Sequence, residues 1–249
     1  MRILQKLALV SLLWMVAVSA LADQNPPGAD DVLHDDLSLP YLLHVPQSGT
    51  KGAPLIVLLH GMGSNERDLY ALKAAFPARF AIASARAPYT LGDDSYQWYR
   101  STQVHGRLDG DPAQLDASRV KIAKLVDQLV SRYGFDSREV YLVGFSQGAI
   151  MSYEVALTNQ GLVKGIGVMS GAIYESLVPQ IKASFALSHL HVFISHGDAD
   201  SRIPVAYAQS ASLWLTRFGI KPALHVYPGM EHQISESALR DLVDWLSNQ

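Results

Sequence analysis

Residues 140–151 read VYLVGFSQGAIM and contain the pentapeptide Gly144-Phe145-Ser146-Gln147-Gly148. The run up to Phe145 is almost wholly apolar, with β-branched and aromatic side chains that are typical of a buried strand. The run after Ser146 carries apolar residues at helical spacing. A glycine two positions to either side of the serine permits a sharp bend between the two elements. The stretch therefore predicts a strained strand–turn–helix that lifts the hydroxyl of Ser146 out of the end of the strand.

Apolar runs and amphipathic segments alternate along the rest of the chain. Strands are predicted at 40–45, 54–59, 80–84, 140–145, 165–170, 191–195 and 223–227, and helices at 65–76, 113–133, directly after Ser146, 204–218 and 235–246. Residues 86–112 lack periodicity and are predicted to form a long loop, and 171–189 a connector with weak helical character. The alternation predicts an α/β fold with a mostly parallel, doubly wound sheet and helices on both faces, in one domain over 34–249.

The N-terminal 22 residues have the pattern of a secretory signal peptide. Arg2 and Lys6 precede an apolar run over 7–18, and Ala20-Leu21-Ala22 forms a cleavage site of small residues. Twelve apolar residues are too few for the ~20 that a spanning helix needs, so we expect cleavage after Ala22 and no membrane span in the mature chain. Residues 23–33 are expected to be a flexible leader, and the protein is expected to be exported to the periplasm or secreted.

The composition excludes several classes of function. The apolar fraction is 49% and the charged fraction 17%, which suits a folded globular protein. The formal net charge is −3 and no basic stripe is present, so nucleic-acid binding has little support. The chain has no cysteine and therefore no disulfide. His189 and His191, spaced by two, lack a third ligand nearby and are interpreted as structural, so we expect no metal site.

A serine hydroxyl needs a base to become a nucleophile, and the base needs a partner to orient it. His232 follows the predicted strand 223–227 and is the candidate base. Asp198 and Asp200 follow the strand 191–195, and either is a candidate acid, with a slight preference for the later one because it projects further from the strand end. Carboxyl ends of strands are where open α/β sheets place their ligands.

An oxyanion in such a site is stabilised by two backbone amides. The amide of Gln147, directly after the serine, is the first candidate. The segment His60-Gly61-Met62-Gly63 follows an early buried strand, and its small residues permit close approach of a substrate. We assign the Met62 amide as the second donor, with Gly61 as the alternative, and interpret His60 as structural.

Four segments together resemble the phospholipase/carboxylesterase family of α/β-hydrolases, which includes bacterial carboxylesterases and acyl-protein thioesterases. They are LLHGMGSNERDL, VYLVGFSQGAIM, HGDADSRIPVAYA and YPGMEHQIS, and the resemblance extends over about 54–249. It implies that Ser146 is the nucleophile and His232 the base. The acid implied by the family pattern is Asp200 rather than Asp198.

The resemblance also assigns the pocket. The oxyanion amides are those of Met62 and Gln147, and Trp98 and Tyr99 are expected to line the acyl side. Only 54 residues separate Ser146 from Asp200 and 32 separate Asp200 from His232, which leaves no room for a large cap domain. We therefore expect an open site roofed by the loop 86–112, whose other aromatic residues are Tyr89 and Tyr96. Arg100 or Arg107 is either a recognition group for an anionic substrate or an ordinary surface side chain.

The predicted reaction is two-step hydrolysis of a small-molecule carboxylic ester with a short or medium acyl chain, without cofactor or metal. A lysophospholipase or an acyl-thioesterase on the same scaffold is the alternative enzyme, and a non-catalytic binding protein is the alternative from another class. The signal peptide departs from the cytosolic members of the family, which argues against a role in protein deacylation. The oligomeric state, monomer or homodimer, is open.

Overall fold

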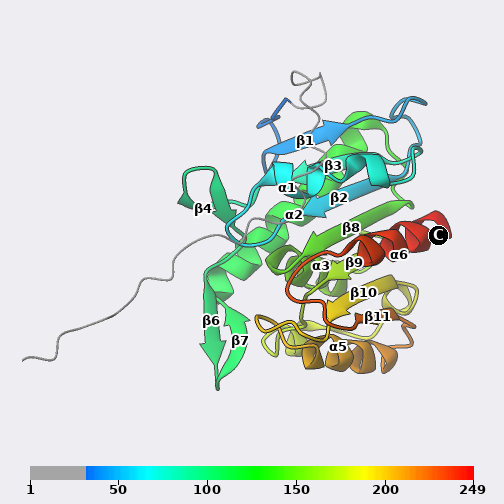
Figure 1. Ribbon diagram of the computed structural model, residues 1–249. Helices are drawn as coiled ribbons and strands as arrows, with labels where there is room; N and C mark the ends of the chain where they lie inside the picture. The colour runs from blue at the N-terminus through cyan, green and yellow to red at the C-terminus, as the bar shows by residue number, and fades with distance from the viewer. Residues whose placement is uncertain (1–31) are drawn as a thin grey trace, which may run out of the picture.

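The computed structural model describes residues 32–249, built around a seven-stranded sheet (Figure 1). The predicted signal peptide and the leader up to residue 31 lie outside the described residues. The strands are β1 (Tyr41–His44), β2 (Leu55–Leu59), β3 (Ala81–Ala85), β8 (Val140–Phe145), β9 (Gly165–Met169), β10 (His191–Gly197) and β11 (Ala223–Tyr227). Their order across the sheet is β1-β3-β2-β8-β9-β10-β11, and only the β1–β3 pair in this sheet is antiparallel. The prediction of a mostly parallel sheet is confirmed.

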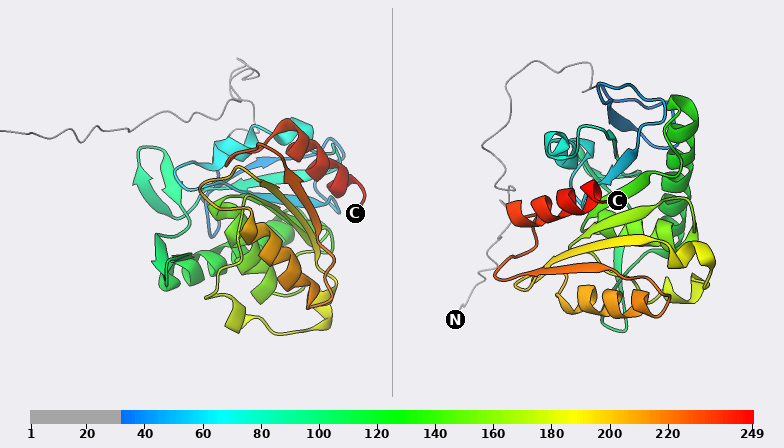
Figure 2. Two further views of the ribbon diagram at one scale, coloured as in Figure 1. Left: turned by 60° about the horizontal axis from the view of Figure 1, so that its bottom comes forward. Right: turned by 90° about the vertical axis from the view of Figure 1, so that its right-hand side faces the viewer.

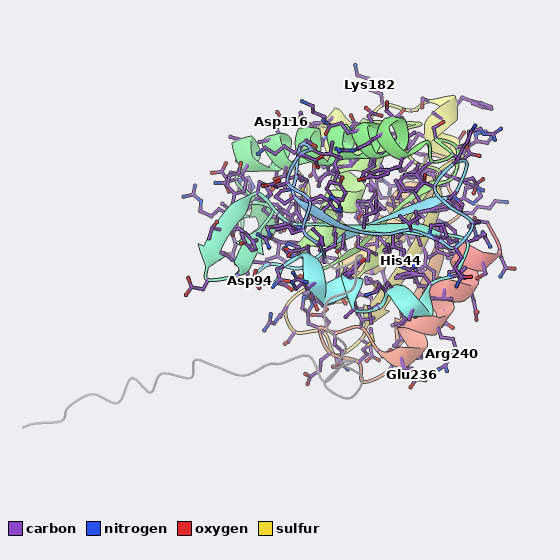
Figure 3. The ribbon with its side chains drawn as sticks, turned by 90° about the horizontal axis from the view of Figure 1, so that it is seen from above. His44, Asp94, Asp116, Lys182, Glu236 and Arg240 are labelled. Atoms are coloured by element: carbon purple, nitrogen blue, oxygen red, sulfur yellow. The ribbon has the colours of Figure 1, made fainter. Side chains whose placement is uncertain are left out.

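Helices cover both faces of this sheet (Figure 2). The longer ones are α2 (Pro112–Tyr133), α3 (Gln147–Thr158), α5 (Ala206–Thr216) and α6 (Glu236–Ser247). Shorter pieces are α1 (Glu66–Tyr70), α4 (Phe185–Ser188) and 3₁₀ turns at Lys73–Ala75 and Val178–Gln180. Figure 3 shows Asp116 of α2 and Glu236 of α6 on opposite sides of the sheet. Within residues 32–249, no helix has the length and the apolar character that crossing a bilayer requires.

The buried strands divide their side chains between two apolar cores. In β2, Leu55, Val57 and Leu59 pack into the core that also receives buried residues of α2, α3 and α5. Ile56 and Leu58 point to the other face and pack with residues of α1 and α6. All five residues of β2 are buried, which explains why parallel strands in this chain read as continuous apolar runs.

The order of the strands places a topological switch between β2 and β8. From β2 the chain goes outward to β3 on one side, and it later returns to form β8 on the other side, with Leu59 paired with Gly144. The connections that leave the carboxyl ends of β2 and β8 thus run toward opposite edges of the sheet. Such a point is where open α/β sheets bind their ligands.

The prediction that 86–112 is a loop is wrong, because this stretch forms two β-hairpins. One pairs β4 (Tyr89–Gly92) with β5 (Ser95–Gln97), and the other pairs β6 (Ser101–Val104) with β7 (Arg107–Gly110). In Figure 1 the hairpin with β4 lies at the left, and β6 and β7 extend downward at the lower left. Strands of three or four mostly polar residues are too short to show a period. The turn at His105-Gly106 has φ values of 52° and 76°, the left-handed pair that a two-residue hairpin turn requires.

Helix boundaries follow the capping signals in the sequence. The side chain of Asp111 accepts hydrogen bonds from the amides of Ala113 and Gln114 at the start of α2, and Gly134 ends that helix with φ 72°. The side chain of Asn65 caps α1 by accepting from the Arg67 amide. The predicted helix 65–76 is nevertheless interrupted, since α1 ends at Tyr70 and a 3₁₀ turn follows.

Glu154, in α3, carries a buried carboxyl group that has no ion-pair partner among the described residues. Its side chain is 2% exposed, and its Oε1 atom has no hydrogen-bond partner within the described residues. Burial raises the pKa of Glu154 to about 7; the charge of Arg119 opposes this shift, and those of Asp109 and Asp116 add to it. The unfolded chain ionises this group near its ordinary pKa of 4.5, so between these two values folding requires the uptake of a proton.

We expect Glu154→Gln to remove a loss of stability that the wild type suffers as pH rises. Because the pKa of Glu154 is raised in the folded protein, the stability of the wild type is highest at low pH, where the carboxyl group is protonated. This stability is lost from about pH 5 to pH 8, as the group ionises. The difference in unfolding free energy between the two proteins should change by roughly 2–3 kcal/mol over this window. Urea unfolding at four pH values measures it. Glu236→Gln, at a side chain that is 90% exposed, is the matched control. Parallel pH curves for wild type and Glu154→Gln would contradict the expectation.

Candidate active site

Ser146 lies between β8 and α3 in a strained backbone conformation. Its φ is 54° and its ψ is −116°, and its amide donates to the carbonyl of Met169 at 3.0 Å. A positive φ at a residue other than glycine costs about 1–3 kcal/mol, which the surrounding structure must offset. A Cβ atom at Gly144 would overlap the backbone of Gly148, and one at Gly148 would overlap the carbonyl group of Leu59. Glycine is therefore required on both sides of the turn.

Three of the predicted residues form a continuous chain of hydrogen bonds. The Nδ1 atom of His232 lies 2.7 Å from Oδ2 of Asp200, and its Nε2 atom lies 2.9 Å from Oγ of Ser146. An ionised carboxylate only accepts, so Nδ1 carries the proton and Nε2 is free to accept from the serine hydroxyl. The histidine side chain is 9% exposed and packs against the ring of Phe145, with ring centroids 5.0 Å apart.

The two candidate aspartates have different partners. Oδ1 of Asp200 accepts from the amides of Arg202 and Ile203, each at 2.9 Å, so both oxygens of this buried carboxylate are engaged. Oδ1 of Asp198 instead accepts from the amide of Gly229 at 2.6 Å, and the residue is exposed. The structure brings Asp200 to the histidine and uses Asp198 to join the two loops that follow β10 and β11.

The environment of Asp200 keeps it ionised. Burial by itself raises the pKa of Asp200. The N–H of the neighbouring His196 and hydrogen bonds from His232 and the Ile203 amide outweigh that effect and hold the pKa well below its usual range. The carboxylate therefore carries its negative charge at every pH at which a histidine could act as a base.

The two loops that hold the candidate oxyanion amides lie side by side. Gln147 is the first residue of α3, where backbone amides point away from the helix without intrahelical partners. In the other loop the Gly63 amide donates to the Tyr96 carbonyl at 2.8 Å. The amides of Gly61 and Met62 have no acceptor in the part of the chain that the structure describes. Both therefore stay available for a ligand, and the choice of Met62 remains a prediction.

The side chain of Gln147 has a role that the sequence did not indicate. Its Oε1 atom accepts from the Trp98 amide at 3.0 Å, and its Nε2 atom donates to the Tyr99 carbonyl at 2.9 Å. The indole of Trp98 donates to the carbonyl of His60 at 2.8 Å. One short segment, 98–99, is thus bonded both to the start of α3 and to the loop after β2, and it fixes the spacing of the two.

Trp98 and Tyr99 do not line an accessible pocket, which corrects the sequence expectation. Both side chains are fully buried, and the Tyr99 hydroxyl lies 2.9 Å from that of Tyr174. They support the residues of the site from within the core. Tyr89 and Tyr96 keep partial exposure.

His60 is held as a neutral structural group. The Ala87 amide donates to its Nε2 atom at 3.1 Å, so Nδ1 carries the proton and donates to the Gly61 carbonyl at 2.7 Å. Burial lowers the pKa of His60, in agreement with a neutral ring. The ring therefore connects the loop after β2 to the end of β3, away from any role as a base.

A buried ion pair attaches the first hairpin to the same loop. Glu66, at the start of α1, receives two hydrogen bonds from the guanidinium of Arg86, at 2.6 and 2.7 Å. The guanidinium also lies over the ring of Tyr96, 4.6 Å from its centroid, and 3.7 Å from the carboxylate of Asp94. Glu66 is fully buried, so loss of either partner would leave an uncompensated charge.

Arg100 and Arg107 are already paired. Arg100 binds Asp111 at 2.8 Å, and Arg107 binds Glu175. These partners favour the interpretation as surface side chains. His189 and His191 are both exposed, and no three potential metal-binding side chains come together among residues 32–249.

Comparison with known proteins identifies the family of the chain. Residues 42–249 match the family described as phospholipase/carboxylesterase. The chain belongs to this family. Its members hydrolyse ester-type bonds, which confirms the prediction of an enzyme of the carboxylesterase type.

Two curated relatives cover most of the chain. Lysophospholipase-like protein 1 of Mus musculus is 24% identical over 231 residues, which are 84% of this chain and 94% of the mouse protein. Esterase YpfH of Escherichia coli is 27% identical over 208 residues, or 81% and 86% of the two chains.

Solved structures confirm the α/β-hydrolase fold without a large cap domain. Esterase PE8 superposes with a TM-score of 0.71 at 29% identity and covers 85% of this chain and 98% of its own. The carboxylesterase from Mesorhizobium loti gives a TM-score of 0.75 at 19% identity, with 88% and 99% coverage, and bears on the fold alone.

The close approach at Gly148 predicts the effect of adding one methyl group there. Gly148→Ala should lower the unfolding free energy by about 3 kcal/mol or more and abolish ester hydrolysis, because the added Cβ displaces either Leu59 or the start of α3. Gly92→Ala is the control, since a Cβ there meets nothing within 4 Å. Thermal unfolding and a p-nitrophenyl ester assay measure both effects. A Gly148→Ala protein with wild-type stability would refute the steric account.

Proposed function

We propose that this protein hydrolyses carboxylic esters through an acyl-enzyme intermediate, with Ser146 as nucleophile, His232 as general base and Asp200 as the acid that orients it. The hydrogen-bond chain from Asp200 through His232 to Ser146 carries this proposal. Membership of the phospholipase/carboxylesterase family supports the type of reaction.

In the first step the Ser146 hydroxyl attacks the ester carbonyl and transfers its proton to Nε2 of His232. The ionised Asp200 stabilises the imidazolium that forms, and it holds the ring in the tautomer that leaves Nε2 free. The amides of Gln147 and Met62 bind the negative oxygen of the tetrahedral intermediate. His232 then returns the proton to the departing alcohol. A water molecule, activated by the same histidine, then hydrolyses the acyl-enzyme and releases the carboxylic acid product from Ser146.

The proposed substrate class rests on the lack of a large cap domain and on the names of relatives. Without a cap domain the site is open to solvent, which suits short or medium acyl chains. A relative of 27% identity from Mycosarcoma maydis is named acyl-protein thioesterase 1, and the mouse relative is named as lysophospholipase-like. Acyl-thioesterase or lysophospholipase activity on the same triad is therefore the second candidate.

Turnover of p-nitrophenyl butyrate by the wild type and three variants tests the proposal. Ser146→Ala should reduce activity to background. Asp200→Asn should lower kcat by about 10⁴-fold, because an amide at this position stabilises the wrong tautomer of the histidine. Asp198→Asn is the matched control and should stay within about threefold of wild type, since Oδ1 of Asp198 accepts from the Gly229 amide and not from His232. A loss at Asp198 equal to that at Asp200 would contradict the assignment.

The same variants separate the alternatives. A series of p-nitrophenyl esters from acetate to palmitate, with matched acyl-thioesters and lysolipids, orders the substrates by kcat/KM, and we expect the short and medium esters to lead. A preference for thioesters or lysolipids would favour the second candidate. A wild type that is inert on all three classes, and whose Ser146 stays unlabelled by a fluorophosphonate, would favour a binding protein.

We also propose that the protein is exported and cleaved after Ala22. Its support is the sequence of residues 1–22 alone. After expression of the full chain in a bacterial host, we expect it in the periplasm or the medium with Asp23 as its first residue. Cell fractionation with N-terminal sequencing measures this. A cytoplasmic protein that keeps Arg2 and Lys6 would refute it.

A further inference from the structure

His196 is a fully buried histidine next to the proposed acid, and the mechanism above does not use it. It is the sixth residue of β10, paired with Val226 of β11, and its side chain has no exposed surface. It stands four residues before Asp200, at the start of the loop that carries this carboxylate. A buried imidazole beside the carboxylate of a proposed catalytic residue is a candidate for a functional role.

The contacts of His196 show which ring nitrogen carries the hydrogen. Its Nε2 atom lies 2.7 Å from the carbonyl oxygen of Ile203 and 3.4 Å from Oδ2 of Asp200. Both neighbours are acceptors, so Nε2 must carry the hydrogen. The short contact is the hydrogen bond, and the longer one adds electrostatic attraction to the carboxylate.

The other ring nitrogen has no partner among the described residues to receive a proton from it. Nδ1 is buried and has no hydrogen-bond partner within residues 32–249. A second proton there would add a buried positive charge with an unpaired donor, which is unfavourable. A neutral N–H holds the carboxylate without cancelling its charge. The full negative charge of Asp200 therefore remains available to the imidazolium that forms on His232.

We propose that His196 is a positioning residue that acts through Asp200, an inference that rests on the proposed function. Its N–H ties the carbonyl of Ile203 to the end of β10, while the amide of Ile203 donates to Oδ1 of the same carboxylate at 2.9 Å. The loop is thus closed on both sides of Asp200, and Oδ2 is held toward Nδ1 of His232. The energetic coupling runs from His196 to Asp200 and from there to the base.

A double-mutant cycle tests this coupling on the full chain. His196→Phe keeps the ring volume and removes the donor, and we expect kcat for p-nitrophenyl butyrate to fall by about 30-fold with KM changed less than about threefold, as for a misplaced catalytic group. For the cycle, the rate of fluorophosphonate labelling of Ser146 is measured in both backgrounds. His196→Phe should slow labelling by about 30-fold in the wild type and by less than about twofold in Asp200→Asn, because residues that act as a unit are not additive. Ser84→Ala, another buried polar side chain, in β3, is the control and should leave kcat unchanged.

Conservative variants cover the case in which His196→Phe does not fold. The amide nitrogen of Gln reaches the place of Nε2, whereas that of Asn stops at the place of Nδ1. We expect His196→Gln to keep kcat within about fivefold of wild type and His196→Asn to lose at least about tenfold more. Equal kcat for the two amides, wild-type kcat for His196→Phe, or an equal loss with and without Asp200 would overturn the role of His196. An inert wild type would instead overturn the proposed function.

Discussion

The approach of the start of α3 to the carboxyl end of β2 is the constraint on which the site depends. Gly148 lies so near the Leu59 carbonyl that no side chain fits between them. This approach fixes the turn at Ser146 in its strained conformation and brings the loop after β2 beside the start of α3. The strain is tolerated because β8 and α3 on either side are almost wholly buried. A local backbone cost is thereby offset by apolar packing distributed over the two cores.

Two buried carboxyl groups show how strongly hydrogen-bond donors decide charge inside this protein. Asp200 has two backbone amides and two imidazole N–H groups around it, and its pKa lies well below the usual range. Glu154 leaves one oxygen without a partner, and its pKa rises to about 7. Burial acts in the same direction on both. The difference comes from the donors that the loop after β10 supplies and that the middle of α3 does not.

The sequence predicts those parts of the protein whose signals are local. The buried parallel strands appear as continuous apolar runs, and the turn at Ser146 as a serine between glycines, so the sheet and the place of the candidate nucleophile follow directly. The two hairpins between 89 and 110 escape prediction, because strands of three or four polar residues carry no period. The burial of Trp98 and Tyr99 and the bonds of the Gln147 side chain arise only when distant segments meet. The choice between Asp198 and Asp200 needed the resemblance to a family for the same reason.

The order of the site along the chain ties its assembly to the completeness of the protein. Ser146 comes first, Asp200 follows in the loop after β10, and His232 comes only after β11, shortly before the last helix. A chain that ended before residue 232 would contain Ser146 and Asp200 but would lack His232, which connects their side chains. Under the proposed mechanism, the base is therefore added only when nearly the whole polypeptide has been synthesised.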